Sequence, residues 1–387
     1  MKSTTTIAVR NGLETDIQYG SVVPPMHLST NYCFDDALSP REFDYSRSGN
    51  PTRALLADTL AKLEKGAGAI ITNTGMSAIT LVLQLLKPHD LLIVPHDSYG
   101  GSLRLFKAFA DKGCFKLDII DQTQEEQIQS AIAKEPKMVW LETPSNPLLR
   151  IVDIQKIANK LEGSHTLLVV DNTFLSPLLQ KPLSLGADII VHSTTKYING
   201  HSDVVGGAVI AKTDDLSETL CWWGNTLGLT GGAFDAYQTL RGVRTLPIRI
   251  KQHEQNAKKV VNILSEHHAV SQLYYPGLEN HIGHEIAKRQ QSGFGGMVSF
   301  ELKGDHNALI QFVHRLQLFS LAESLGGVES LVCVPALMTH RSMDNDAQVK
   351  AGIKPTLIRL SIGVEDGDDL ATDLKQALDT VLLGDKD

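Results

Sequence analysis

The chain has 387 residues, of which 42% are hydrophobic and 21% charged, so it can bury a large core and divide into about two domains. Its net charge is −8 and its charges of both signs are mixed, which argues against nucleic acid or an anionic membrane as a partner. The first residues, MKSTTTIAVRNGLETD, lack the apolar core of a secretory signal. We therefore expect a globular, cytoplasmic protein.

The cysteines and histidines predict no metal site. The four cysteines lie far apart and form no CxxC pair, which argues against a zinc ribbon and a disulfide scaffold. His267 and His268 are adjacent, which is not metal-ligand spacing on a helix, and we expect both to be solvated.

The first 50 or so residues are rich in proline, tyrosine and serine, which is typical of an extended arm. From about residue 66, short β-rich runs alternate with helical segments. The predicted strands are 69–72, 91–94, 115–120, 138–141, 166–170, 188–191 and 207–211. Several runs are continuously apolar, as expected for parallel strands that helices cover on both faces. This pattern predicts an α/β fold with a mostly parallel sheet of about seven strands.

The sequence changes character after Pro247. We predict a long polar helix over 251–267, strands over 295–302 and 357–363, and a last helix over 370–383 with one apolar face. These elements indicate a smaller α+β domain. The predicted organisation is an arm over 1–50, a large domain over 51–246 and a C-terminal domain over 247–387.

Residues just after the predicted strands are candidates for ligand contacts, because open parallel sheets bind ligands beyond the carboxyl ends of their strands. Gly75 and Met76 open a helix after the first strand, where free N–H groups and the helix dipole favour an anion such as phosphate. Ser193 and Thr195 add hydroxyl donors after 188–191. A plain helix cap by Thr74 explains the first of these features equally well.

Three further strand-end residues point to one cofactor. Asp171 follows 166–170, where a semi-buried carboxylate needs a cation or strong donor, such as a protonated ring nitrogen. Lys196 follows 188–191 and could form an imine, and the ring of Tyr99 could stack on a flat cofactor. Each has a common structural explanation by itself. Together with a phosphate cradle, they favour pyridoxal 5'-phosphate (PLP).

Competing motifs are weaker. The chain has no Walker A loop, no complete dinucleotide fingerprint and no G-x-S-x-G. Ser193 to Lys196 fits the S-x-x-K pattern of penicillin-binding serine acylases, but SDV and KTD stand where that pattern expects S-D-N and K-T-G.

Eight segments across the chain resemble the Cys/Met-metabolism family of PLP enzymes. They are YSRSGNPT (45–52), TNTGMSA (72–78), PHDSYGGS (95–102), ETPSNP (142–147), VVDNTF (169–174), HSTTKYINGHSDVVGG (192–207), ESLGGVESL (323–331) and MTH (338–340). The resemblance implies the PLP transferase fold of type I, similar to aspartate aminotransferase. It also implies a homotetramer, built as a dimer of dimers with shared active sites.

The resemblance assigns roles to residues. For the cofactor, it implies Lys196 as the imine lysine, Asp171 at the pyridine nitrogen, Tyr99 as the stacking ring, and Gly75, Met76, Ser193 and Thr195 at the phosphate. Tyr45 and Arg47 would reach the phosphate of a neighbouring subunit. For the substrate, Arg359 would clamp the α-carboxylate with help from Ser324, and Glu323 and Arg104 would lie near the distal end.

The segments 222–246 and 289–302 resemble most the family members that make cystathionine. They imply γ-replacement, which joins O-succinyl-L-homoserine to L-cysteine and releases succinate. The alternatives are β- or γ-cleavage of cystathionine, and a binding protein that keeps the fold without catalysis. Two departures bear on the substrate: Ser48 follows Arg47 where close relatives have a second arginine, and Val334 stands where many have histidine.

Overall fold

The computed structural model describes residues 2–341 and 345–381. The chain divides into two compact units. The first comprises Met1–Asp90, Lys137–Val139 and Ile154–Pro247, and the second comprises Leu91–Pro136, Trp140–Asp153 and Ile248–Asp387. The division into an arm, a large domain and a C-terminal domain stays a prediction.

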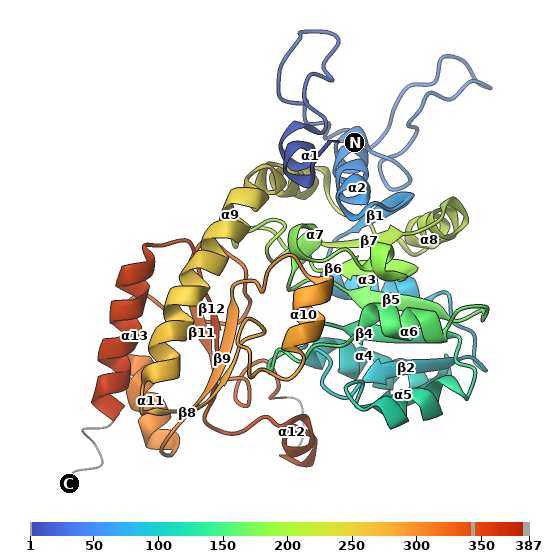
Figure 1. Cartoon of the computed structure of the whole chain (residues 1–387). Coiled ribbons are helices and arrows are strands. Elements are labelled where there is room, and N and C mark those ends of the chain that lie inside the picture. Colours follow the sequence, from blue (N-terminus) through green and yellow to red (C-terminus); the bar gives the residue numbers. More distant parts are fainter. Residues whose placement is uncertain (1, 342–344, 382–387) are drawn as a thin grey trace. The chain divides into compact units, whose positions relative to one another are not determined.

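The α/β fold is confirmed by a seven-stranded mixed sheet with the order β1-β7-β6-β5-β4-β2-β3 (Figure 1). The strands are β1 (Gly68–Thr72), β2 (Leu91–Pro95), β3 (Lys116–Ile120), β4 (Met138–Glu142), β5 (Leu167–Asp171), β6 (Ile189–His192) and β7 (Gly207–Ala211). All seven predicted strands are present. β2 and β3 pair in parallel, as do β5 and β6, whereas β7 runs antiparallel to both β1 and β6.

Helix α2 of the first unit shows how the local sequence determines where a helix begins and ends. Asn50 caps it by accepting hydrogen bonds from the N–H groups of Thr52 and Arg53, and Pro51 occupies the first turn, where no intrahelical N–H is needed. The helix ends at Lys65, which has a left-handed backbone. The other helices of this unit that precede residue 233 are α1 (Thr4–Arg10), α3 (Gly75–Leu83), α6 (Ile154–Lys160), α7 (Ser176–Leu179) and α8 (Asp214–Leu227), with α2 itself spanning Pro51–Glu64.

The N-terminal arm is mostly irregular, as predicted, but α1 was not foreseen. Ser3 caps α1 by accepting a hydrogen bond from the N–H of Thr6, a short-range signal that weak hydrophobic periodicity hides. Between α1 and α2 the arm carries only isolated bridges, at Asn31 with Tyr45 and at Asp36 with Ser39. Several apolar side chains of the arm stay exposed, among them Ile17, Tyr19 and Leu38.

The second unit contains a five-stranded sheet with the order β10-β11-β12-β9-β8. Its strands are β8 (Val270–Tyr274), β9 (Met297–Leu302), β10 (Ser320–Leu321), β11 (Leu331–Cys333) and β12 (Leu357–Ser361). Its remaining helices are α4 (Gly100–Asp111), α5 (Glu125–Ile132), α10 (His284–Gln290), α11 (His306–Arg315), α12 (Asn345–Ala351) and α13 (Gly367–Val381). The predicted apolar face of α13 is buried in the core, while residues 382 and 383 lie outside the described residues.

Two predictions about the C-terminal part were wrong. The long helix α9 spans Ala233–Glu266, whereas the prediction began it at residue 251 (Figure 1). The helix contains Pro247, although a proline removes one helical N–H. Buried side chains on both sides of the proline, such as Val243 and Val260, stabilise the continuous helix. His267 is not solvated: its side chain is 7% exposed, and Nε2 lies 3.1 Å from a carboxylate oxygen of Asp379.

None of the described helices is long and apolar enough to cross a membrane. The cytoplasmic location stays a prediction from the sequence.

Candidate active site

Asp171 lies at the carboxyl end of β5 in the first unit. Its Oδ1 accepts hydrogen bonds from the Thr173 N–H at 3.1 Å and from the Thr173 hydroxyl at 2.6 Å. Burial raises the pKa of Asp171, while the bonds from Thr173 and the nearby His192 imidazole lower it. Both described hydrogen bonds go to Oδ1, so Oδ2 is available to a further donor.

Lys196 lies in the connection between the neighbouring antiparallel strands β6 and β7. Hydrogen bonds hold this connection in place at Ser193 and at Thr195. The N–H of Ser193 donates to the Thr173 hydroxyl at 2.9 Å, and the hydroxyl of Thr195 donates to the Gly206 carbonyl at 3.1 Å. The N–H of Lys196 donates to the Ser193 carbonyl at 3.2 Å. Thr173 therefore bonds both the Asp171 carboxylate and the segment that carries Lys196.

Gly75 begins α3 beside Ser193. Thr74 caps this helix by accepting a hydrogen bond from the Ser77 N–H at 2.9 Å, as the alternative interpretation of this turn required. That cap leaves the N–H groups of Gly75 and Met76 without an intrahelical acceptor. A Cβ at Gly75 would lie only 2.9 Å from the Cβ of Ser193, so the helix start and the Ser193 loop approach closely because residue 75 is glycine.

These residues fit PLP by their donor and acceptor chemistry. The start of α3 and the Ser193 hydroxyl supply donors to a phosphate. The Asp171 carboxylate supplies an acceptor to a protonated ring nitrogen, and Lys196 supplies the amine. The first unit thus contains side chains and N–H groups that could serve the phosphate, the ring nitrogen and the imine, and these roles stay predictions.

Tyr45 and Arg47, predicted to serve a neighbouring subunit, lie on the arm. Tyr45 is half exposed, and the guanidinium carbon of Arg47 lies 5.7 Å from the centre of its ring. Arg47 Nη1 donates to the carbonyl and the side-chain oxygen of Asn225 at 2.8 and 2.7 Å. The adjacent Ser48 is turned back onto the arm, where its hydroxyl donates to the Asp44 carboxylate at 2.9 Å.

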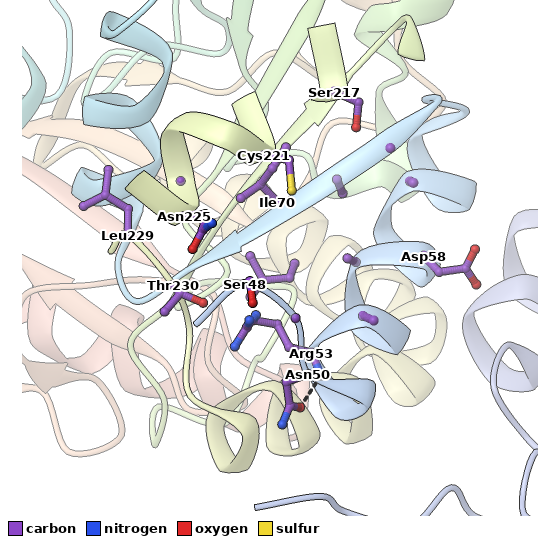
Figure 2. Close-up of a pocket in the computed structure, with 18 of the residues that line it drawn as sticks. Ser48, Asn50, Arg53, Asp58, Ile70, Ser217, Cys221, Asn225, Leu229 and Thr230 are labelled. Carbon is purple, nitrogen blue, oxygen red and sulfur yellow. Dashed lines mark hydrogen bonds between the residues drawn. The ribbon is translucent and has the colours of Figure 1, made fainter. Parts of the chain in front are cut away.

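Arg47 also lines a cavity of about 420 Å³ in the first unit. Figure 2 shows this cavity with Ser48, Asn50 and Arg53 from the arm and α2, and Cys221 and Asn225 from α8. None of Gly75, Asp171, Ser193 and Lys196 lines it. The cavity is therefore separate from the residues that fit the cofactor.

Tyr99 and Arg104 belong to the second unit. Tyr99 precedes α4, its N–H donates to the Glu142 carboxylate at 2.8 Å, and its side chain is 43% exposed, which leaves the ring open to a stacking partner. Arg104 on α4 is exposed, as is Glu323.

Arg359 on β12 is almost fully buried in the second unit. Nη1 donates to the Asn146 side-chain oxygen at 2.8 Å and Nη2 donates to the Ser324 carbonyl at 3.0 Å. Within residues 2–341 and 345–381, these acceptors are neutral and no carboxylate pairs with the guanidinium. A buried cation without a counter-ion is costly, so this arrangement suits an anionic ligand such as a carboxylate.

Two neighbours of Arg359 were missed by the sequence reasoning. Asn146 belongs to the family segment ETPSNP (142–147), but no neighbouring residue in the sequence predicts its hydrogen bond with Arg359 on β12. His340 belongs to the quoted MTH and is fully buried. Burial, together with the charge of Arg359, lowers the pKa of His340 to about 4, so its imidazole is neutral beside the guanidinium.

The comparisons with known proteins agree with this chemistry. The model of the Cys/Met metabolism PLP-dependent enzyme family matches residues 5–379. The chain belongs to this family. PLP is therefore its cofactor, and the fold and enzyme class expected from the sequence are confirmed.

Three similar proteins show which enzymes the family includes. A cystathionine gamma-synthase of Escherichia coli strain K12 is 56% identical, with 96% of each chain covered. A cystathionine beta-lyase of Lactococcus lactis subsp. cremoris is 45% identical, with 98% of this chain and 100% of that protein covered. The crystal structure of a Xanthomonas oryzae pv. oryzae cystathionine gamma synthase, in complex with aminoacrylate and cysteine, is 54% identical, covers 99% of each chain and gives a TM-score of 0.98.

Proposed function

We propose that the chain is a cystathionine γ-synthase that joins O-succinyl-L-homoserine and L-cysteine to give L-cystathionine and succinate, a step of methionine biosynthesis. The observation that carries the proposal is the likeness to cystathionine γ-synthases over nearly the whole chain. It is supported by the presence of Lys196, Asp171, Tyr99 and Arg359. The reaction forms a bond from the cysteine sulfur to the γ-carbon and breaks the bond from the γ-carbon to the succinate oxygen.

Each cofactor residue has a proposed task. Bound PLP supplies an electron sink for the α-carbon. Lys196 Nζ would hold PLP covalently and, when the substrate amine takes its place, would move a proton between the α- and β-carbons. Asp171 Oδ2 keeps the ring nitrogen protonated, and Tyr99 covers a face of the ring. The N–H groups of Gly75 and Met76, with Ser193 and Thr195, hold the phosphate.

The substrate residues that we propose all lie in the second unit. Arg359 binds the α-carboxylate, because its guanidinium is buried, is held by neutral acceptors and forms no ion pair with any described residue. Ser324 borders this position through its carbonyl. Arg104 is proposed for the distal carboxylate of the succinyl group, and Glu323 for the distal amino group of the cysteine-derived part.

Product identification by mass spectrometry tests the proposal. The purified holoenzyme is incubated with O-succinyl-L-homoserine and L-cysteine, and separately with L-cystathionine alone. We expect cystathionine and succinate in the first incubation and little keto acid in the second. Rapid loss of cystathionine with pyruvate or 2-oxobutyrate would instead establish a β- or γ-lyase.

The lyase is the second candidate because the Lactococcus β-lyase is similar over nearly the whole chain. Glu323 favours a synthase or γ-lyase, since we expect an aromatic residue there in many bacterial β-lyases. In the double incubation, pyruvate marks β-cleavage and 2-oxobutyrate marks γ-cleavage. Each candidate therefore gives a different product.

We further propose a homotetramer, built as a dimer of dimers, in which Tyr45 and Arg47 reach the phosphate of a neighbouring subunit. The exposed apolar side chains of the arm support it, because exposed apolar surface of this kind marks contact with another chain. Mixing two inactive variants tests the shared site. If Arg47→Ala and Lys196→Ala subunits exchange, each mixed pair regains one intact site and activity returns; no recovery after verified exchange contradicts sharing.

A further inference from the structure

Glu64 and His192 form a fully buried pair in the first unit. Glu64 is the last residue of α2, His192 is the last residue of β6, and both side chains are at most 1% exposed. His192 Nε2 lies 2.6 Å from Glu64 Oε1. Because a carboxylate can only accept, the proton of this hydrogen bond belongs to Nε2.

Asn172 joins this pair to the residue next to it, Asp171. The Asn172 side-chain amide donates to the same Glu64 oxygen at 2.9 Å, and its backbone N–H donates to the Val191 carbonyl at 3.0 Å. Asp171 and Val191 are register partners across β5 and β6, so His192 follows directly on the neighbouring strand. Because side chains alternate along a strand, Asp171 projects from one face of the sheet, whereas His192 and Asn172 project from the other.

The position of Glu64 is unfavourable for a carboxylate on local grounds. It lies at the C-terminal end of a helix, where the macrodipole repels negative charge, and one of its oxygens has no hydrogen-bond partner. A buried carboxylate there is tolerated only with cationic or strong donor partners. Two charged or titratable groups interact electrostatically with the pair: Lys181 with Glu64, and Asp171, from the other face of the sheet, with His192.

We propose that Glu64 and His192 are positioning residues for the cofactor, which hold the Asp171 carboxylate in place from the opposite face of the sheet, so that it can keep the PLP ring nitrogen protonated. Glu64 orients the imidazole through the contact with Nε2, as carboxylates do for metal-bound histidines. Burial raises the pKa of Asp171, and the hydrogen bonds from Thr173 and the interaction with His192 act in the opposite direction. Asn172 fixes the backbone directly after Asp171, so the pair also sets where that carboxylate lies.

The test measures the protonation of the PLP ring nitrogen directly and uses no substrate. Its result is therefore independent of whether the chain is a synthase or a lyase. The holoenzyme is loaded with PLP labelled with ¹⁵N in the ring, and the NMR shift of that nitrogen is followed against pH. The variants are Glu64→Gln, His192→Gln and the double variant. At position 64 glutamine keeps the shape of glutamate, and at position 192 it keeps a hydrogen-bond donor where the imidazole was. Visible absorbance checks that each variant is loaded with PLP, and thermal unfolding checks that it is folded.

We expect each single variant to lower the pH midpoint of ring-nitrogen deprotonation by about one unit or more. The double variant should lower it no further than His192→Gln, because the two residues act as one unit. The matched control is His253→Gln, a fully buried histidine of the second unit whose Nδ1 hydrogen-bonds to the Ile362 carbonyl, and it should leave the midpoint unchanged.

An unchanged midpoint in either single variant overturns the proposal, even if its thermal stability falls, since a purely structural pair would affect unfolding alone. Additive shifts in the double variant would also overturn it. Asp171→Asn serves as the reference, because the inference rests on the proposed role of Asp171. If that variant leaves the midpoint in place, the role of Asp171 fails and the inference fails with it.

Discussion

Asn146 and Arg359 are joined by a hydrogen bond of 2.8 Å from the guanidinium Nη1 to the amide oxygen, although 213 residues separate them in sequence. The bond fixes Nη1 of the buried guanidinium, and the bond to the Ser324 carbonyl fixes Nη2. Nε of Arg359 makes no hydrogen bond with the residues that the structure describes. Because both acceptors are neutral, the positive charge of Arg359 remains available to an anionic ligand, such as the substrate carboxylate that we propose.

Replacing Asn146 with alanine should therefore weaken substrate binding more than it weakens the fold. A hydrogen bond to a charged group contributes about 1.5–3 kcal/mol, so we expect KM for the amino-acid substrate to rise by roughly tenfold or more. Steady-state kinetics measure this. Asn307→Ala, on the exposed start of α11, is the matched control, and an equal effect in both variants would contradict the role of Asn146.

Lys196→Ala should abolish covalent attachment of the cofactor. Reduction with borohydride followed by peptide mass spectrometry should give labelled Lys196 in the parent enzyme and no labelled peptide in the variant. Turnover should fall by about 10²–10⁴-fold or more, as expected when a proton-transfer group is removed. Lys212→Ala removes an exposed lysine that follows β7 and should retain both labelling and turnover; a variant at position 196 that keeps turnover would refute the assignment.

Gly75→Ala should reduce affinity for PLP by about ten- to a hundredfold, because overpacking typically costs about 1–3 kcal/mol. The added Cβ would lie 2.9 Å from Ser193 Cβ and force the phosphate donors apart. Equilibrium binding of PLP to the apoenzyme measures the loss. At Gly232 the nearest atom to an added Cβ lies 3.5 Å away, so Gly232→Ala should bind normally.

Stability should fall as pH decreases from about 6.5 to about 4. Burial lowers the pKa of His340 from its ordinary value of 6.5 to about 4, so in this interval the unfolded chain binds a proton that the folded chain does not. The stabilisation is present above pH 6.5 and is lost toward pH 4, by on the order of 3 kcal/mol for this group. Burial lowers the pKa of His253 and of His281 to about 4 as well, which adds to the effect.

Thermal unfolding against pH checks this dependence. His340→Gln should show a flatter decline of Tm than the parent enzyme, because the variant has one proton fewer to take up on unfolding. His306→Gln, which removes an exposed histidine at the start of α11, should follow the parent curve. A parallel decline in His340→Gln would show that His340 does not titrate as described.

The sheet was predictable from the sequence because its strands are short apolar runs with polar residues at their ends. Asp171 and Lys196 could be selected by position alone, since each follows such a run. Helix α9 was misjudged because a proline is a local signal, whereas the buried residues that carry the helix through it act by tertiary packing. Local signals and packing conflict there, and packing determines the structure.

The surroundings of Arg359 and of Asp171 could not be predicted. Nothing near residue 359 in sequence points to Asn146, and nothing near residue 192 points to Glu64, because each partner is brought by a different element. His340 was quoted in a family motif, but its burial beside a guanidinium is visible only in three dimensions. Sequence pattern locates the reactive groups, while the groups that orient them follow from tertiary contacts.

The Glu64–His192 pair also bears on how the chain folds. Its two members are 128 residues apart, and Asn172 is 108 residues from Glu64. Contacts of such high sequence separation form only after the entropy of closing a long loop has been overcome, which makes folding slow. We therefore expect the Glu64–His192 pair to form late on the folding pathway. If so, PLP would bind after the pair has formed and would stabilise the finished fold by mass action.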